Sequence, residues 1–242
     1  MPSHYNDLNS FWEQNSGDFQ PKYPDFFDPE WLVMESNFPW FRLSALDNQS
    51  WSQMYQEAKA LTPYFHSHRD TVGEGWHSLT VHGLEEDTQT LDSYIPQYGS
   101  RQKVLENLHY TWVAEQCPTV KHFLDNVWPA EFLNRVRFMY LEPGGYILPH
   151  QDRASDQKRL SVCNISLNNP ADCEFVMEGW GTVPFEDSGS AYLMDISNVH
   201  SVWNTSNEPR IHMIIHYEMG RRIRDFFYVL RNSYYTNIEQ GL

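Results

Sequence analysis

From about residue 134 onward, apolar and polar residues alternate in short runs that are separated by turn-forming residues. Pro143-Gly144-Gly145 and Asn168-Asn169-Pro170 are two such turns. Side chains of a strand alternate between two faces, so short alternating runs broken by Gly, Pro and Asn are typical of antiparallel strands. The runs are RVRFMYL, YILPH, RLSVCNISL, CEFVM, AYLMDI, SVW and RIHMIIHYE. They predict a mainly β fold with flanking helices, built on a double-stranded β-helix (a cupin-like jelly roll).

The flanking segments have a different pattern. Trp51, Met54, Ala58 and Leu61 recur at helical spacing after Ser50, a plausible N-cap. Further helices are expected at 101–115, 119–128 and 221–235, and a strand is expected at 76–84. Residues 1–50 lack periodicity and predict an irregular arm anchored by Trp31, Phe38, Trp40 and Phe41. The expectation is one domain over 1–242: 1–133 covers the core as arm and helices, 134–218 forms the jelly roll, and 219–242 adds a C-terminal helix.

Composition and charge restrict the class of partner. The 242 residues are 40% hydrophobic and carry a formal net charge of -15 at pH 7, which argues against nucleic acid and anionic membrane surfaces as partners. The N-terminus has neither the basic nor the apolar segment of a secretory signal, and no run is apolar enough to span a membrane. A cytoplasmic protein with a small-molecule or peptide substrate is therefore expected. Cys163 and Cys173 are expected to be buried free thiols rather than a disulfide.

The strongest chemical signal is His150-Gln-Asp152, followed much later by His200. A His and a carboxylate two residues apart on one strand project to the same face. A second His from a distant strand completes the facial triad of non-haem Fe(II) oxygenases, which leaves three coordination positions open. The sequence therefore predicts that His150, Asp152 and His200 bind iron and form the catalytic centre.

Arg210 begins the apolar strand RIHMIIHYE, ten residues after His200. A guanidinium directed into a jelly roll needs a planar anion to offset its desolvation, and the distal carboxylate of 2-oxoglutarate is such an anion. Arg159, at the start of RLSVCNISL, is a candidate second contact to this cosubstrate. Ser161, in phase with Arg159 on the same strand, is a third candidate. His212 and His216 are more simply structural, as are His66, His68, His77 and His82, which lack nearby carboxylates at ligand spacing.

The segment RVRFMYLEPGGYILPHQD, which ends at Asp152, resembles the metal-binding segment of the aspartyl/asparaginyl β-hydroxylase family. The resemblance continues through Arg159, the segment 189–195 and His200 to Asn204 and Arg210, and covers about residues 134–218. It implies a double-stranded β-helix oxygenase that uses Fe(II), 2-oxoglutarate and O₂. Matched by position, His150, Asp152 and His200 would bind iron, and Arg159 and Arg210 would bind 2-oxoglutarate.

Two positions depart from the animal peptide hydroxylases of that family, which have Gly in place of Asp152 and His in place of Ser161. The chain is therefore more similar to the bacterial full-triad members, such as L-proline cis-4-hydroxylase-like enzymes. Both departures weaken the case for a peptide substrate of the EGF-domain type. A carboxylate at Asp152 also fills the position that halogenating relatives leave open for halide, which favours hydroxylation.

Hydroxylation of an unactivated C–H bond is the activity that the resemblance implies. The substrate would be an amino acid, a small metabolite or a peptide side chain, and succinate and CO₂ would be the co-products. The alternative is a non-catalytic, cupin-like metal- or ligand-binding module. Arg210 separates the two, because a binding module has no use for a buried guanidinium facing the metal. A metal-dependent isomerase or dioxygenase without 2-oxoglutarate is a third possibility, although such sites usually contain more histidines.

Overall fold

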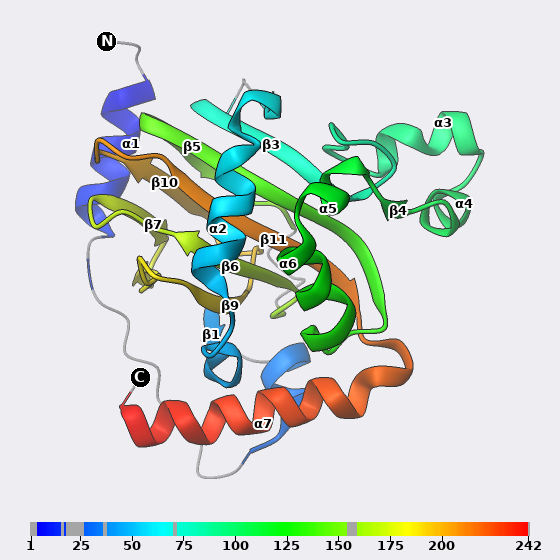
Figure 1. Ribbon diagram of the computed structural model, residues 1–242. Coiled ribbons are helices and arrows are strands. Elements are labelled where there is room, and N and C mark those ends of the chain that lie inside the picture. The colour runs from blue at the N-terminus through cyan, green and yellow to red at the C-terminus, as the bar shows by residue number, and fades with distance from the viewer. Residues whose placement is uncertain are drawn as a thin grey trace.

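The computed structural model describes residues 4–15, 17, 27–35, 38–69, 72–153 and 159–241 (Figure 1). The strands are β1 (Trp40–Arg42), β2 (His66–Ser67), β3 (Gly73–Gly83), β4 (His109–Tyr110), β5 (Phe132–His150), β6 (Val162–Asn168), β7 (Cys173–Met177), β8 (Gly181–Thr182), β9 (Ser190–Met194), β10 (His200–Asn204) and β11 (Arg210–Glu218). The helices are α1 (His4–Gln14), α2 (Trp51–Ala60), α3 (Ile95–Tyr98), α4 (Arg101–Glu106), α5 (Trp112–Gln116), α6 (Pro118–His122) and α7 (Ile223–Gln240).

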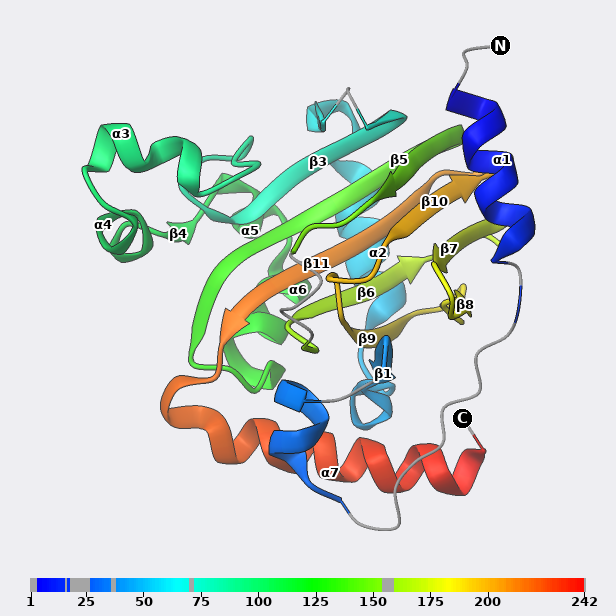
Figure 2. The ribbon, with the colours of Figure 1, turned by 180° about the vertical axis from the view of Figure 1, so that it is seen from behind.

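The strands form an antiparallel sheet in the order β1-β9-β6-β11-β5-β10-β7-β8, with β3 also paired to β5. The long strand β5 connects the two halves of this order. Its first part pairs with β11 from Phe132 to Leu141, and its last part pairs with β10 from Tyr146 to His150. Between them Gly144 has a φ of +75°, a conformation that favours glycine. The sheet therefore curls on itself at β5 (Figure 2), which confirms the predicted jelly-roll core with flanking helices.

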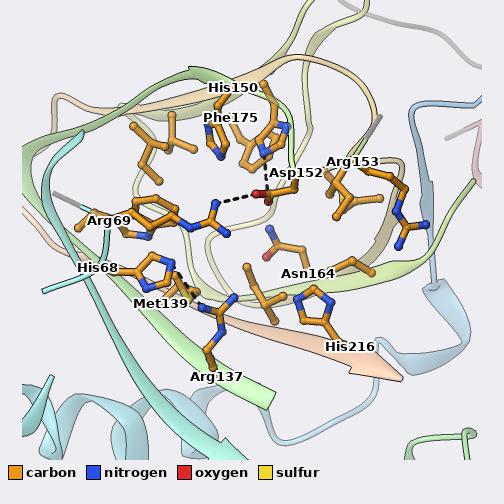
Figure 3. Close-up of a pocket in the computed structure, with 18 of the residues that line it drawn as sticks. His68, Arg69, Arg137, Met139, His150, Asp152, Arg153, Asn164, Phe175 and His216 are labelled. Carbon is orange, nitrogen blue, oxygen red and sulfur yellow. Dashed lines mark hydrogen bonds and ion pairs between the residues drawn. The ribbon is translucent and has the colours of Figure 1, made fainter. Parts of the chain in front are cut away.

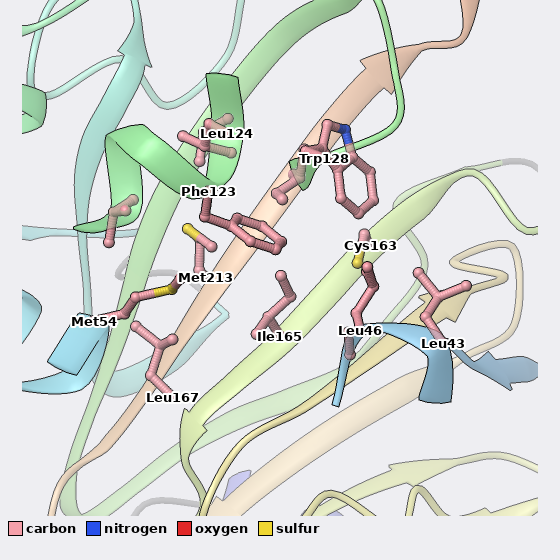
Figure 4. Packing of buried hydrophobic residues seen from close by; sticks show 14 of the residues in the cluster. Leu43, Leu46, Met54, Phe123, Leu124, Trp128, Cys163, Ile165, Leu167 and Met213 are labelled. Carbon is pink, nitrogen blue, oxygen red and sulfur yellow. The ribbon is translucent and has the colours of Figure 1, made fainter. Parts of the chain in front are cut away.

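Strand alternation separates a helix-covered face from the inner face of the curled sheet. On β11, Ile211, Met213 and Ile215 belong to the main hydrophobic core, whereas Arg210 and His212 are buried polar residues of the opposite phase. Helices α2, α5 and α6 cover the outer face, and α7 runs along one end of the molecule (Figure 1). Met54 of α2 and Phe123 pack onto the sheet there (Figure 4). The inner face is left free to form a site.

Several elements differ from the sequence-based expectations. Residues 1–50 contain helix α1, whose Trp12 packs edge-on against Trp203 at 6.0 Å, and strand β1, which pairs with β9. Strands β1 and β3 are part of the sheet, so the first 133 residues do more than cover the core. The helix predicted at 101–115 is divided by β4. Its second part, α5, begins at Trp112 after the N-cap Thr111, whose hydroxyl accepts from the Val113 N–H.

Two further observations concern the helices and the cysteines. Helix α7 runs five residues further than the predicted Tyr235, to Gln240, and ends at Gly241 in the left-handed conformation. None of the helices in the described part of the chain has the length and apolar character of a membrane span. Cys117, Cys163 and Cys173 are buried free thiols, as predicted.

Candidate active site

His150, Asp152 and His200 meet at one end of the inner face. Their potential ligand atoms all lie within 4.8 Å of one another, so the three side chains can hold a single metal ion. His200 of β10 lies directly opposite His150 at the end of β5, and their ring centroids are 4.4 Å apart. Asp152 lies in the bend just after β5 rather than on the strand, and its N–H donates to Ile196 O at 3.2 Å. The bend, not strand alternation, places the carboxylate.

Backbone hydrogen bonds fix the tautomer of both histidines. His150 Nδ1–H donates to Leu148 O at 2.8 Å, and His200 Nδ1–H donates to Asn198 O at 2.9 Å, because a carbonyl oxygen can only accept. In the neutral form of either ring, Nε2 is then the nitrogen without a proton and can bind a metal. Phe175 stacks on the His200 ring at 5.3 Å and an interplanar angle of 8°. Burial, reinforced by His150, lowers the pKa of His200 to about 4, so the ring is neutral near pH 7.

The Asp152 carboxylate has two different neighbours. Its Oδ1 accepts from Arg69 Nη1 at 2.7 Å, and its Oδ2 lies 3.9 Å from His200 Nε2 (Figure 3). Burial by itself raises the pKa of Asp152, but His200 and Arg69 together hold it below its usual range. Two neutral imidazoles and one carboxylate form the donor set of a non-haem Fe(II) site, and these residues fit such an ion.

Arg210 lies buried in the same cavity, with 3% of its surface exposed. Its guanidinium lies 5.9 Å from the ring centroids of both Phe175 and Phe185. Its Nη2 donates to His212 Nδ1 at 2.8 Å, and its Nε has no partner among the described residues. Burial lowers the pKa of Arg210 to about 10 and keeps His212 neutral, so no counter-charge balances the guanidinium within the described chain.

Asn204 holds the turn that leads into Arg210. Its Nδ2 donates to Glu208 O at 2.8 Å and to Glu142 O at 3.1 Å. The turn before β11 is thereby attached to the bend of β5, and Arg210 enters the strand at a fixed position opposite Leu141.

Arg159 and Ser161 lie elsewhere. They line an outer cavity that shares five residues with the inner one, namely Arg69, Arg135, Asp152, Arg153 and His216. The Arg159 side chain is exposed, and the buried Ser161 Oγ has no partner among the described residues. The structure thus brings His150, Asp152, His200 and Arg210 into one cavity and does not bring Arg159 or Ser161 into it.

The sequence-based reasoning did not identify four arginines that also line the inner cavity, namely Arg69, Arg135, Arg137 and Arg153. The run RVRFMYL carried a signal for two of them, since Arg135 and Arg137 are in phase with Met139 on β5. Arg69 follows β2 in a loop and has a φ of +50°. No periodicity in the sequence indicated where its side chain would lie.

Solved structures with a similar chain path include several oxygenases. A prolyl-4-hydroxylase from Pseudomonas putida is 14% identical, with 77% of this chain and 96% of that chain covered and a TM-score of 0.41. A 2OG-Fe(II) oxygenase family protein from Burkholderia pseudomallei is 10% identical, with 84% and 96% covered and a TM-score of 0.42. A prolyl hydroxylase from Trichoplax adhaerens, in complex with a hypoxia inducible factor peptide, is 10% identical, with 74% and 88% covered and a TM-score of 0.40. Likenesses this distant say nothing about the substrate of this chain.

Sequence comparison gives a more specific result. No curated protein matches the chain. The family model of the aspartyl/asparaginyl β-hydroxylases matches residues 48–219, which is more than half of the 242 residues and includes both histidines, Asp152 and Arg210. The match agrees with the resemblance noted from the sequence and extends it toward the N-terminus. The chain therefore belongs to the aspartyl/asparaginyl β-hydroxylase family and is a 2-oxoglutarate- and Fe(II)-dependent oxygenase.

Proposed function

We propose that this protein hydroxylates an unactivated C–H bond of an amino acid, a small metabolite or a peptide side chain, and forms succinate and CO₂ from 2-oxoglutarate. One observation carries the proposal. The free Nε2 atoms of His150 and His200 and the Asp152 carboxylate meet in a cavity that also contains the buried, carboxylate-free guanidinium of Arg210. A binding module would gain nothing from desolvating that guanidinium beside a metal site.

Each residue has a distinct role in this proposal. His150, Asp152 and His200 hold Fe(II) on one face and leave the opposite face open for cosubstrate and O₂. Arg210 binds the distal carboxylate of 2-oxoglutarate through a charge-assisted pair. His212 accepts from Arg210 Nη2 and so orients the guanidinium. Arg159 remains a proposed cosubstrate contact from the family resemblance, and Ser161 remains one from its phase with Arg159 on the same strand. Both would act from the outer cavity.

The bound iron would supply the oxidation of 2-oxoglutarate and of the substrate C–H bond by O₂. The chain's own residues orient the reactants and exclude water. An apolar wall of the cavity is formed by Trp76, Met139 and Ile147. Phe175 covers the His200 ring. Such walls keep a substrate carbon close to the metal and out of contact with bulk water. The buried free thiols agree with a cytoplasmic location, which we also propose.

Anaerobic titration tests the site without turnover. Fe(II) followed by 2-oxoglutarate should give wild-type protein a visible charge-transfer band, because a 2-oxo acid chelated to Fe(II) absorbs in that range. Arg210→Ala should require roughly a hundredfold more 2-oxoglutarate for the same band, since a charged hydrogen-bonded pair is lost. His200→Ala should give no band. Bands of equal strength in wild type and His200→Ala would show that the metal binds elsewhere.

A further inference from the structure

A second cationic group lies in the same cavity, apart from Arg210. It consists of Arg135 and Arg137, neighbours on the inner face of β5. On β11, Arg210 is opposite Leu141, whereas Ile214 is opposite Arg137 and His216 is opposite Arg135. Four residues of strand separate Arg210 from Ile214, which corresponds to about 13 Å. The two groups of arginines therefore enter the cavity from different positions along the sheet.

Arg137 is buried without an opposite charge. Only 4% of its surface is exposed, and its Nη1 has two long contacts of 3.4 Å, to His68 Nε2 and to Gln89 O. Its Nε has no partner among the described residues. Burial lowers the pKa of Arg137 well below its usual range, and Arg135 and Arg69 lower it further. A buried guanidinium in this setting is stabilised when an anion enters the cavity.

Arg135 likewise has no carboxylate partner among the residues that the structure describes. Its guanidinium contacts Gln89 O and, through Nη2, His216 Nε2 at 3.2 Å, and both of these partners are neutral acceptors. No ion pair joins Arg135 or Arg137 to a carboxylate in the part of the chain that the structure describes. Asp152, the acidic residue that lines the inner cavity, is paired with Arg69.

The mouth of the cavity is also basic, although the chain as a whole is acidic. The formal net charge is -15. The outer cavity nevertheless contains five arginines, namely Arg69, Arg101, Arg135, Arg153 and Arg159. Of the three acidic residues there, Asp92 is paired with Arg101, Asp152 is paired with Arg69, and Glu218 accepts from Asn134 Nδ2. A cleft with an excess of one charge sign attracts ligands of the opposite sign and raises their rate of entry.

We propose that Arg137, with Arg135 beside it, binds the anionic group of the substrate, a carboxylate or a phosphate. The inference rests on the proposed function and specifies its substrate class: a small organic anion. The inner cavity has a volume of about 200 Å³, which suits a small molecule or one side chain. Met139, Trp76 and Ile147 form an apolar part of the same lining, where they would contact the aliphatic part of the substrate. Figure 3 shows Arg137, Met139 and His68 on one side of the cavity, facing Asp152.

Binding measurements with matched acid and neutral probes test the proposal. The protein is loaded with Mn(II) in place of iron and with saturating 2-oxoglutarate, so that the Arg210 position is filled and no turnover occurs. The probes are butyrate with butyramide and butyl phosphate with butanol, so that each neutral partner lacks the anionic group, and calorimetry measures each affinity. At least one acid should bind wild type tenfold or more tightly than its neutral partner. A difference within the carboxylate pair indicates that the substrate carries a carboxylate, and a difference within the phosphate pair indicates that it carries a phosphate.

Variants assign the effect to Arg137. Arg137→Gln should weaken binding of the preferred acid at least tenfold, and Arg137→Lys should weaken it less, because the charge is kept. Arg224 is an exposed arginine on α7, so Arg224→Gln is the matched control and should bind the preferred acid as tightly as wild type does. The 2-oxoglutarate affinity should fall more in Arg210→Gln than in Arg137→Gln. If Arg137→Gln does not fold, Arg135→Gln replaces it and should also weaken binding of the preferred acid. The comparison of acid with neutral probe in wild type then still tests the proposal.

Four results would overturn the proposal. Three of them are equal binding of acid and neutral probes by wild type, no anion binding by wild type, and unchanged anion binding by folded Arg137→Gln. A greater loss of 2-oxoglutarate affinity in Arg137→Gln than in Arg210→Gln would also overturn it, because Arg137 would then be a cosubstrate residue. Failure of wild type to bind Mn(II) and 2-oxoglutarate without any probe would instead contradict the proposed function.

Discussion

Arg69 donates from Nη1 to Oδ1 of Asp152 at 2.7 Å and leaves the other carboxylate oxygen on the side of His200. The backbone of Arg69 has a φ of +50°, which a non-glycine residue adopts only when its surroundings hold it there. The pair determines which oxygen of Asp152 is free to bind a metal. Arg69 is therefore a positioning residue for the triad.

Replacing Arg69 should weaken metal binding. In Arg69→Ala the carboxylate loses its orienting partner, and loss of such a contact typically lowers metal affinity about 10- to 100-fold. Calorimetry with Mn(II) measures the change, with Arg224→Ala as the exposed control. A folded Arg69→Ala protein with wild-type Mn(II) affinity would show that the bend after β5 orients Asp152 without help.

Arg210 and Arg159 should differ in their effect on the cosubstrate. Arg210 lies in the cavity of the triad, whereas Arg159 is exposed in the outer cavity. Arg210→Ala should raise the KM for 2-oxoglutarate roughly a hundredfold, as expected for loss of a buried charged pair. Arg159→Ala should raise it by less than about tenfold, since exposed charge pairs contribute little. Equal increases in KM would place Arg159 at the cosubstrate together with Arg210.

Stability should fall on acidification because of buried histidines. His68 and His82 lie outside the triad, and the pKa values of His200, His212 and His216 shift in the same direction. Burial lowers the pKa of His68 to about 2, with Arg137 adding to the effect, and burial lowers that of His82 to about 4, with His109 adding to it. Both titrate near 6.5 when unfolded. Between about pH 6.5 and pH 4 the unfolded chain therefore binds more protons, and the free energy of unfolding decreases as the pH falls.

The size of this pH effect can be measured by urea unfolding of the metal-free protein. Each histidine contributes a slope of up to about 1.4 kcal/mol per pH unit in that window. His82→Gln should make the slope shallower. A free energy of unfolding that stays constant from pH 7 to pH 5 would mean that these rings become protonated inside the fold.

The outer face of the sheet should supply much of the stability. Phe138 on β5 is fully buried in the main core, while Phe132 on the same strand is 52% exposed. Phe138→Ala should lower the free energy of unfolding by about 3–5 kcal/mol, because burial is lost and a cavity is left. Phe132→Ala should change it by about 0.5 kcal/mol or less. Similar losses in both variants, measured by urea unfolding, would contradict this packing.

The jelly roll was predictable from sequence because it depends on strand periodicity. Alternation in RIHMIIHYE predicts that Ile211 and Met213 lie on one face of the strand and Arg210 and His212 on the other. In the structure the first two belong to the main hydrophobic core and the other two are buried polar residues. The residue types and spacing of His150, Asp152 and His200 predicted a metal site, but a bend rather than strand alternation places the Asp152 carboxylate beside the two histidines.

Helix α1 was missed although Leu8, Phe11 and Trp12 have helical spacing, because most of its residues are polar. Its Trp12 contacts a strand nearly two hundred residues away. Tertiary contacts of this kind leave no local pattern.

The cationic part of the cavity could not be predicted from sequence either. Arg135 and Arg137 were in phase with core residues of the same strand, but their burial without carboxylates depends on β3, β5 and β11 being brought together. Arg69 depends on a loop conformation with a positive φ, which residue type alone does not predict for arginine. Contacts made by loops and by strand partners distant in sequence required the structure.

The most direct test of the central claim is succinate formation from 2-oxoglutarate in the presence of Fe(II), O₂ and ascorbate, without added substrate. Members of this enzyme class oxidise 2-oxoglutarate slowly even when uncoupled, so wild type should form succinate above the rate of free Fe(II). His200→Ala should reduce the rate to that background, because one of the three ligand atoms is lost. No succinate from wild type, or an undiminished rate in His200→Ala, would contradict the account.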